Sequence, residues 1–127
     1  MASPLILSID DDPDVLMFIE TVLKSKGYDV VTAETAEQGL RIFKEKKPDM
    51  VIVDLMMEEV DAGTNFVREL KVMREDIPVF MLSSVGNALN MNTNFADLGL
   101  KGVLQKPIEP DTLLALVEKT VGKSKSD

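Results

Sequence analysis

Three aspartates stand where two apolar runs of the chain end. Asp10 and Asp11 directly follow Leu5–Ile9, and Asp54 directly follows Met50–Val53. Ligands of open α/β sheets bind at the edge where the parallel strands end, so we expect the three carboxylates to converge there. Close carboxylates repel one another, and a hard divalent cation with oxygen ligands removes that conflict. The spacing therefore predicts a Mg²⁺ site.

A hydroxyl and an ammonium group follow two further apolar runs. Ser83 comes after the fourth run, and Lys106 comes after the fifth and precedes Pro107. The residue before a proline is held extended, which could aim the ammonium of Lys106 back across the strand ends. There it would pair with Asp54, or with a phosphoryl oxygen once Asp54 carries one. Ser83 could donate its hydroxyl to the same phosphoryl group.

Together these groups suit phosphoryl transfer onto Asp54. A carboxylate that accepts a phosphoryl group forms an acyl phosphate. The protein then needs only to position the donor and to neutralise charge on the transferring oxygens. A metal ion and Lys106 would do this without histidine, which the chain lacks. Each residue alone has an ordinary explanation as a solvated loop acid, a turn serine or an exposed lysine, so the interpretation depends on their combination.

The elements that would position these residues alternate along the chain. The apolar runs are Leu5–Ile9, Val30–Ala33, Met50–Val53, Val79–Leu82 and Val103–Leu104. They are mostly continuous, which is typical of strands buried on both faces of a parallel sheet. Apolar residues at helical spacing lie between the runs at 14–26, 36–46 and 64–74 and after the last run at 110–121, while the asparagine-rich stretch 86–98 predicts a short or frayed helix. The alternation predicts an α/β fold, a doubly wound (βα)₅ sheet with helices on both faces.

Residues at the expected helix ends have structural roles. Asp12 followed by Pro13 is assigned as a helix N-cap and first-turn pair. Gly27 is expected to end the first helix in a left-handed conformation. Thr35 with Gln38 predicts a capping box at the start of the second helix.

Length and composition suit one domain, which we assign to residues 1–127 with an ordered core over about 4–121 and a polar tail over 122–127. A net charge of −8 argues against direct nucleic-acid binding, because phosphate backbones repel such a surface. The chain has no cysteine and no histidine, which excludes disulfides, thiolate metal sites and histidine-based catalysis. No apolar run approaches the roughly 18 residues of a membrane span and the N-terminus lacks a signal-peptide pattern, so we expect a cytoplasmic protein without membrane association.

Four motifs in this order resemble the response-regulator receiver domains of bacterial two-component signalling, in particular single-domain chemotaxis regulators. The motifs are Asp10-Asp11, 48–57 (PDMVIVDLMM), 77–84 (IPVFMLSS) and 105–108 (QKPI). The resemblance covers the chain from about Leu5 to Val121. It implies a flavodoxin-like, five-stranded parallel sheet in the order 2-1-3-4-5.

The resemblance also implies roles for individual residues. Asp54 would be the phosphoacceptor, and Ser83 and Lys106 would contact the phosphoryl group. The ligands of Mg²⁺, or of Mn²⁺ in its place, would be Asp10, Asp11, Asp54 and the backbone carbonyl of Met56. The phosphodonor would be a sensor histidine kinase or a phosphotransfer protein, and phosphorylation would change the surface of the fourth helix, fifth strand and last helix to regulate a downstream protein. Such a domain is a regulator rather than an enzyme, although it assists its own phosphoryl transfer and slow dephosphorylation.

The sequence departs from the family pattern at three places. Glu58, followed by Glu59, stands where the family usually has proline four residues after the phosphoacceptor, and we expect these acids to face solvent. The segment Val60–Gly63 carries one residue more than usual, which would reshape the start of the third helix. Val103 occupies the family's aromatic switch position on the fifth strand, and valine cannot swing a ring in and out.

Two hypotheses concern the phosphorylated protein. Met56 and Val85 would flank the site with apolar groups that cannot orient an attacking water, so we expect the phosphoryl group on Asp54 to persist. The asparagine-rich stretch 87–94 is expected to be mobile and to shift its conformational population on phosphorylation.

Three other functions are compatible with parts of the pattern. A receiver-like interaction module that is never phosphorylated would account for Glu58 and Val103. An aspartate-nucleophile phosphatase would need a second acid two residues after Asp54, where the chain has Met56. A flavodoxin-like flavin binder would need a hydroxyl- and glycine-rich loop after the first strand, and the run Asp10–Asp12 would repel the flavin phosphate.

Overall fold

Strands and helices alternate along the chain, as the sequence predicts. The computed structural model describes residues 4–54, 62–74, 76–83, 101–105 and 108–122. The strands are β1 (Leu5–Ile9), β2 (Asp29–Ala33), β3 (Met50–Asp54), β4 (Val79–Ser83) and β5 (Gly102–Gln105), and the helices are α1 (Pro13–Lys24), α2 (Ala36–Lys46), α3 (Ala62–Met73) and α5 (Pro110–Val121). None of the helices in these ranges combines the length and the apolarity needed to cross a membrane.

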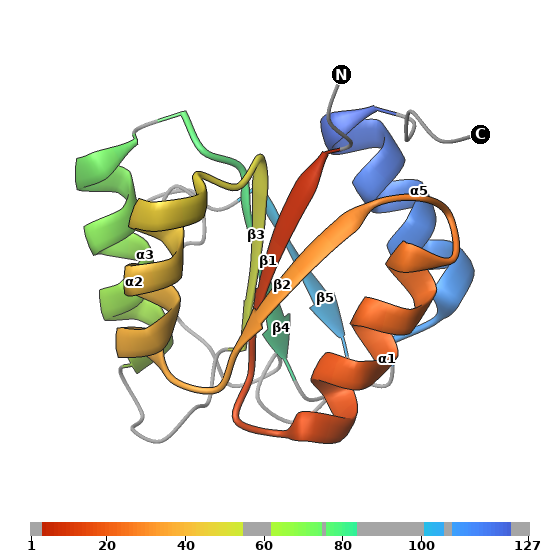
Figure 1. Cartoon of the computed structure of the whole chain (residues 1–127), viewed down its shortest axis with the longest axis horizontal. Coiled ribbons are helices and arrows are strands. Elements are labelled where there is room, and N and C mark those ends of the chain that lie inside the picture. Colours follow the sequence, from red (N-terminus) through yellow and green to blue (C-terminus); the bar gives the residue numbers. More distant parts are fainter. Residues whose placement is uncertain (1–3, 55–61, 75, 84–100, 106–107, 123–127) are drawn as a thin grey trace.

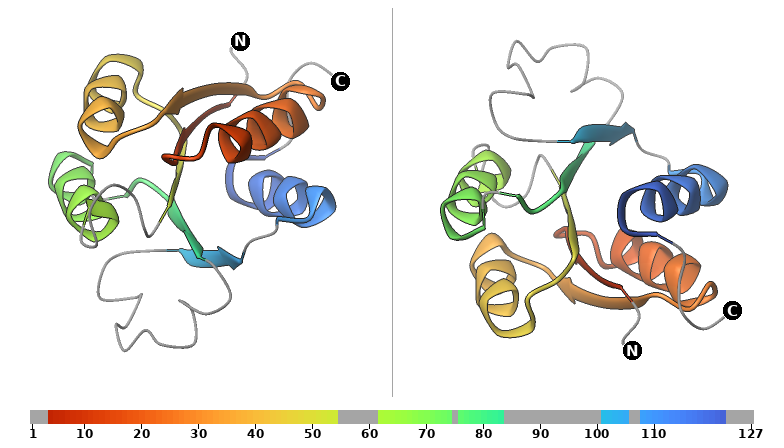
Figure 2. Two further views of the ribbon diagram at one scale, coloured as in Figure 1. Left: turned by 90° about the horizontal axis from the view of Figure 1, so that it is seen from below. Right: turned by 90° about the horizontal axis from the view of Figure 1, so that it is seen from above.

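The five strands form one parallel sheet in the order β2-β1-β3-β4-β5. Helices α2 and α3 cover one face of the sheet, and α1 and α5 cover the other (Figure 1, Figure 2). This confirms the predicted doubly wound fold and the expected strand order. Because all strands run the same way, the sheet has two unlike edges. We call the edge where the strands begin the amino edge, and the edge where they end the carboxyl edge.

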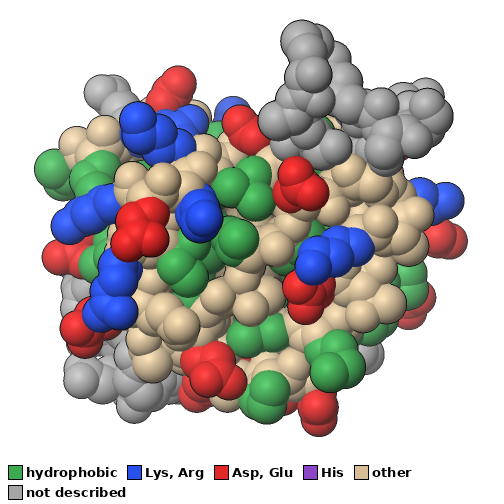
Figure 3. Space-filling model, in the orientation of Figure 1, with side chains coloured by type: hydrophobic (Ala, Val, Ile, Leu, Met, Phe, Trp, Pro, Cys, Tyr) green, Lys and Arg blue, Asp and Glu red, His purple; other side chains and the backbone are tan. Residues whose placement is uncertain are grey.

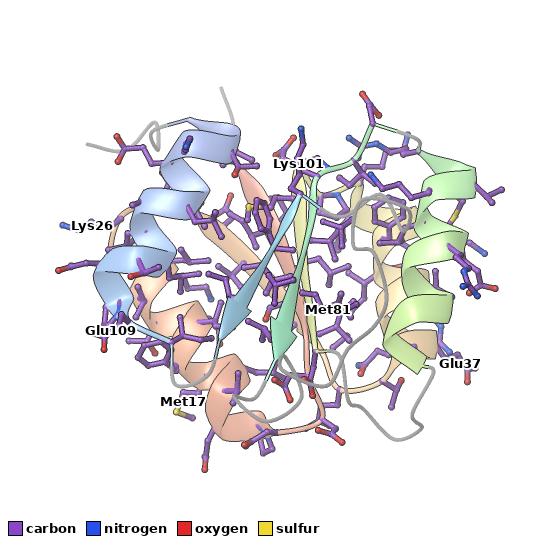
Figure 4. All side chains as sticks on the ribbon, turned by 180° about the vertical axis from the view of Figure 1, so that it is seen from behind. Met17, Lys26, Glu37, Met81, Lys101 and Glu109 are labelled. Atoms are coloured by element: carbon purple, nitrogen blue, oxygen red, sulfur yellow. The ribbon has the colours of Figure 1, made fainter. Side chains whose placement is uncertain are left out.

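Each face of the sheet is buried in its own apolar cluster. On the α2/α3 face, Leu7, Val51 and Met81 pack with Phe43 of α2 and Leu70 of α3. Figure 4 shows Met81 in the interior between the sheet and α3. On the α1/α5 face the packed residues include Ile6, Ile19, Leu23, Ile52, Leu113 and Val117. Burial on both faces explains why the strand sequences are continuously apolar rather than alternating.

The helix ends follow the expected chemistry with two differences. Asp12 is the N-cap of α1, and its side chain accepts a hydrogen bond from the backbone N–H of Asp14. Thr35 caps α2 by accepting from the Gln38 N–H, but the Gln38 side chain accepts from the N–H of Glu34 rather than of Thr35. The Thr35 half of the predicted capping box is therefore present, whereas the Gln38 side chain bonds one residue earlier than predicted.

The connection after α1 turns at Gly27, whose φ is 88°. The helix itself ends earlier than predicted, at Lys24, with Ser25 as its C-cap. Tyr28 follows this turn, is buried, and donates its hydroxyl to the carbonyl of Gly122 at 2.8 Å. This hydrogen bond fastens the end of α5 to the start of β2 at the amino edge.

Candidate functional site

The carboxyl edge brings three aspartates together. Asp10 follows β1, and Asp54 ends the neighbouring strand β3. The two aspartates are neighbours because the residues before them, Ile9 and Val53, are paired in register. Carboxylate oxygens of Asp10, Asp11 and Asp54 lie within 4.8 Å of one another. Asp10 and Asp54 are 0% and 4% exposed, whereas Asp11 is exposed. Two buried carboxylates thus share this edge with a third that faces solvent, and we call these residues the aspartate cluster.

The first helix turn holds Asp10 in place. Its Oδ1 accepts a hydrogen bond from the backbone N–H of Asp12 at 2.9 Å, and its own N–H donates to the carbonyl of Ala33 at 3.1 Å. Asp12 turns its side chain to the helix instead, where its Oδ1 accepts from the Asp14 N–H at 2.9 Å. One aspartate of the run therefore caps α1, while the other two join Asp54.

The aspartate cluster fits a small divalent cation. Mg²⁺ binds oxygens at about 2.1 Å, so two of its ligand oxygens lie at most about 4.2 Å apart. The carboxylate oxygens of the cluster are within 4.8 Å of one another, so a small side-chain rotation would bring them to that separation. Their mutual repulsion in a partly buried site favours a bound cation. An all-oxygen donor set suits Mg²⁺ or Mn²⁺ rather than a softer metal.

The remaining predicted site residues are described in part or not at all. Leu82 lies opposite Asp54, and Ser83 is the next residue of β4, so the Ser83 backbone lies at the same edge as the cluster. The other residues singled out at the site or its flanks lie outside the described ranges; they are Met56, Glu58, Glu59, Val85, the stretch 86–98 and Lys106.

Val103 lies on the α2/α3 side of the sheet. It is paired in register with Met81, is partly buried, and packs against the apolar cluster of that face. An aliphatic side chain here fills space in the core without a rotatable ring. Any conformational response at this position must therefore come from backbone or neighbouring side chains.

Sequence reasoning missed Ser8, a residue of β1 that lies two positions before Asp10. Ser8 is 0% exposed, and within the described part of the chain its Oγ has no hydrogen-bond partner. The available signal was a hydroxyl inside the otherwise apolar run Leu5–Ile9. A buried hydroxyl without a partner among the described residues is a polar group that the fold alone does not explain.

A doubly wound sheet with an acidic cluster at its carboxyl edge defines a class of α/β domains. The chain belongs to one family within it, the response regulator receiver domains, whose model matches residues 6–118. Two-component signalling modules of this family are regulatory rather than enzymes in the ordinary sense, bind Mg²⁺ at an acidic pocket, and interact with histidine kinases and downstream effectors.

Similar proteins support this assignment. The chain is 34% identical over 119 residues to the transcriptional regulatory protein GlrR of Escherichia coli (strain K12), covering 94% of this chain and 26% of GlrR. It is also 34% identical to the probable transcriptional regulator ycf27 of Porphyridium aerugineum, covering 91% of this chain and 47% of that protein. The chain thus spans about a quarter to a half of the length of the curated relatives it matches.

Two solved structures of the same fold are similar along nearly their whole length. A response regulator receiver domain protein from Clostridium thermocellum has a TM-score of 0.83 and 30% identity, covering 93% of this chain and 94% of its own. The chemotaxis response regulator CheY4 of Vibrio cholerae has a TM-score of 0.82 and 25% identity, covering 93% and 98%.

Proposed function

We propose that this domain is a phosphoacceptor that receives a phosphoryl group on Asp54 with the help of Mg²⁺. The observation that carries the proposal is the aspartate cluster, with carboxylate oxygens of Asp10, Asp11 and Asp54 within 4.8 Å at the carboxyl edge. Membership of the receiver family supports the same reading.

In the proposed reaction, a carboxylate oxygen of Asp54 attacks the phosphorus of a phosphohistidine donor. The new P–O bond forms as the donor's P–N bond breaks, and the imidazole leaves with the electron pair and takes up a proton. Asp10 and Asp11, with Asp54 and the Met56 carbonyl, would hold Mg²⁺ or Mn²⁺, which supplies positive charge to the transferring oxygens. Ser83 and Lys106 would contact the remaining phosphoryl oxygens.

The burial of Asp54 is relevant to this chemistry. At 4% exposure it has little contact with bulk water, and Asp10 beside it has none. Electrostatic interactions are stronger in such an environment than in water, so a cation would hold the phosphoryl group more firmly there. Apolar residues at Met56 and Val85 would leave no side chain to orient an attacking water, so we expect slow dephosphorylation.

The proposed partners follow from this role. The donor would be a sensor histidine kinase or a phosphotransfer protein in the cytoplasm. A downstream protein would recognise the surface formed by β5, α5 and the stretch between β4 and β5, once phosphorylation has altered it. We do not expect this domain to contact nucleic acid directly, because a net charge of −8 is repelled by phosphate backbones.

Mass spectrometry tests the proposal directly. Incubation with acetyl phosphate and Mg²⁺ is expected to add the mass of one phosphoryl group, and Asp54→Asn is expected to abolish the addition. Asp12→Asn is the matched control, because it removes the same charge from the same edge yet leaves the cluster and a competent N-cap in place. EDTA should prevent the addition in the wild-type protein.

An interaction module that is never phosphorylated is the alternative. The aliphatic packing of Val103 is the structural observation in its favour, since no ring is present to report phosphorylation at β5. If the wild-type protein gained no phosphoryl group from acetyl phosphate or from a phosphorylated histidine donor, this alternative would replace the phosphoacceptor role.

A further inference from the structure

A cavity of about 600 Å³ opens at the amino edge, at the other end of the sheet from the aspartate cluster. Its described lining comes from the starts of β3, β4 and β5 and from the last turns of α3 and α5. The lining residues are Asp49, Arg74, Asp76, Pro78, Phe80, Lys101, Leu116, Lys119 and Thr120. We call this cavity the amino-edge pocket. Its volume falls within the range of roughly 300–1,000 Å³ typical of small-molecule sites.

Hydrogen bonds fix the walls of the amino-edge pocket. Asp49 Oδ2 accepts from the backbone N–H of Leu5 at 2.8 Å. Arg74 Nη1 donates to the carbonyl of Pro48 at 2.7 Å, and its guanidinium lies 5.8 Å from the centre of the Phe43 ring. The backbone N–H of Lys101 donates to the carbonyl of Val79 at 2.8 Å. The pocket is therefore preformed, and two of its charged side chains already serve the scaffold.

Two lysines of the pocket are available to a ligand. Lys101 and Lys119 are both exposed. Among the described residues, the ion pairs join Lys24 to Glu20 and Arg41 to Glu37, so neither pocket lysine is committed to one. Their ammonium groups can donate to an anion without breaking an existing salt bridge.

The charge of the surrounding edge also favours an anion. Basic residues occupy the last turns of the helices at the amino edge, at Lys24, Lys44, Lys46, Lys71 and Lys119. Acids lie at both edges. Figure 4 shows Glu37 and Glu109 at the starts of α2 and α5, with Lys101 at the other end of the sheet, while Asp49 and Asp76 line the pocket itself. In Figure 3 the described residues at the lowest part of the visible surface, at the carboxyl edge, include acidic side chains and no basic ones. The described lining of the pocket holds three basic residues (Arg74, Lys101 and Lys119) and two acidic ones (Asp49 and Asp76), so its balance is slightly positive in a protein of net charge −8.

An apolar wall complements the two lysines. Pro78 and Leu116 are half-buried in the pocket lining, and Phe80, which also lines the pocket, is buried. Gly102 leaves room for the Phe80 ring, because a Cβ at Gly102 would lie 3.3 Å from that ring. A ligand with a flat apolar body would cover this wall while its acid group reached the lysines.

We propose that the amino-edge pocket binds a small organic anion, with its acid group between Lys101 and Lys119 and its apolar body against Pro78 and Leu116. This site is separate from the aspartate cluster and does not depend on phosphorylation of Asp54. The exposed carboxylate of Asp76 lines the same pocket and opposes the anion, so its removal should tighten binding.

Titration with phenylphosphonate tests this proposal, because the compound joins an aromatic ring to an anionic group through a C–P bond and cannot donate a phosphoryl group. The full chain in EDTA is expected to show saturable shifts of backbone amide resonances within 76–80, 101–102 and 116–120. Inorganic phosphate and benzyl alcohol, each carrying half of the ligand chemistry, should bind more weakly. The same titration of Asp54→Asn should give the same result, which separates this site from the phosphoacceptor.

Charge variants identify the residues responsible. Lys101→Gln and Lys119→Gln are each expected to raise the Kd for phenylphosphonate about tenfold, the effect of losing one charge-assisted hydrogen bond. Asp76→Asn should lower it. Lys46→Gln is the matched control, because it removes the same charge from the same edge but does not line the pocket. The proposal would be overturned by resonance shifts that do not saturate or that are centred on the carboxyl edge. It would also be overturned if Lys46→Gln raised the Kd for phenylphosphonate as much as the two pocket substitutions do.

Discussion

Replacing Asp54 by asparagine is expected to stabilise the metal-free protein and to remove most of its response to Mg²⁺. Asp54 and Asp10 are both buried, and their carboxylate oxygens lie within 4.8 Å. Asparagine keeps the size of the side chain and removes its charge. The repulsion between these carboxylates, which is absent in the unfolded chain, would therefore be relieved in the folded state.

The size of the effect follows from Coulomb's law. Two unit charges 4.8 Å apart repel by about 3.5 kcal/mol at an effective dielectric constant of about 20, and by about 0.9 kcal/mol in bulk water. The substitution also weakens favourable interactions of the Asp54 carboxylate, so we expect a net gain of roughly 1–3 kcal/mol in the free energy of unfolding. In the wild-type protein, Mg²⁺ at about a hundred times its Kd should add about 2.7 kcal/mol by mass action.

Urea denaturation in EDTA and in saturating Mg²⁺ measures both quantities. Adding Mg²⁺ should raise the free energy of unfolding of the wild-type protein. Asp54→Asn should have a higher free energy of unfolding in EDTA and should gain much less from Mg²⁺. Asp12→Asn serves as the control, because it lowers the negative charge of the same edge by one but leaves the aspartate cluster complete. The reasoning fails if Asp54→Asn is no more stable than the wild type in EDTA, or if Mg²⁺ stabilises both proteins equally.

Three further substitutions test the packing and caps around the site by urea denaturation. Asp12→Ala removes the side-chain oxygen that caps α1 and should cost about 1 kcal/mol, whereas Asp12→Asn should cost little; equal losses would contradict the capping role. Ser8→Ala removes a buried hydroxyl without a partner in the described residues and should raise stability by about 1 kcal/mol, while a loss of similar size would show that the hydroxyl is bonded after all. Leu70→Ala, at 0% exposure, should cost about 2–5 kcal/mol. Val72→Ala, on the same helix at 87% exposure, should change stability by no more than about 0.5 kcal/mol, and a similar loss in both would refute the assigned burial.

The sequence predicted the elements well because their signals are local. The run Leu5–Ile9 and the helix 110–121 match β1 and α5 residue for residue. The sequence placed some strand ends one residue short, because polar residues that pair with a neighbouring strand do not look like strand residues. Asp29 belongs to β2 because it pairs in register with Leu5, and Ser83 belongs to β4 because it pairs with Gln105. Strand order is a long-range property that periodicity does not encode, and it was expected only from the family resemblance.

Helix ends illustrate the same limit. Gly27 carries the expected positive φ, since glycine adopts it without steric cost. Lys47, the C-cap of α2, also has a positive φ of 49°, and nothing in a lysine indicates this conformation. It results from the chain having to leave α2 and enter β3 within a few residues.

The convergence of the aspartates could be anticipated because the edge rule for parallel sheets places strand ends together. It was also predictable that Asp12 would cap α1 while Asp10 and Asp11 joined Asp54, since Asp12 stands directly before Pro13 at a helix start. The amino-edge pocket could not be anticipated, because it depends on how distant elements enclose a space. The burial of Ser8 was indicated only by its place inside the apolar run Leu5–Ile9.

The place of Tyr28 decides how the protein can be observed by optical methods. It is the single tyrosine of a chain without tryptophan, so it supplies nearly all of the intrinsic emission. Its hydroxyl is tied to Gly122 at the amino edge, about five strand residues, or roughly 16 Å, from where β2 ends near Asp10. Emission should therefore change when the domain unfolds and α5 detaches, but stay nearly constant when a cation enters the aspartate cluster. A fluorescent reporter of that cluster would have to be introduced by substitution.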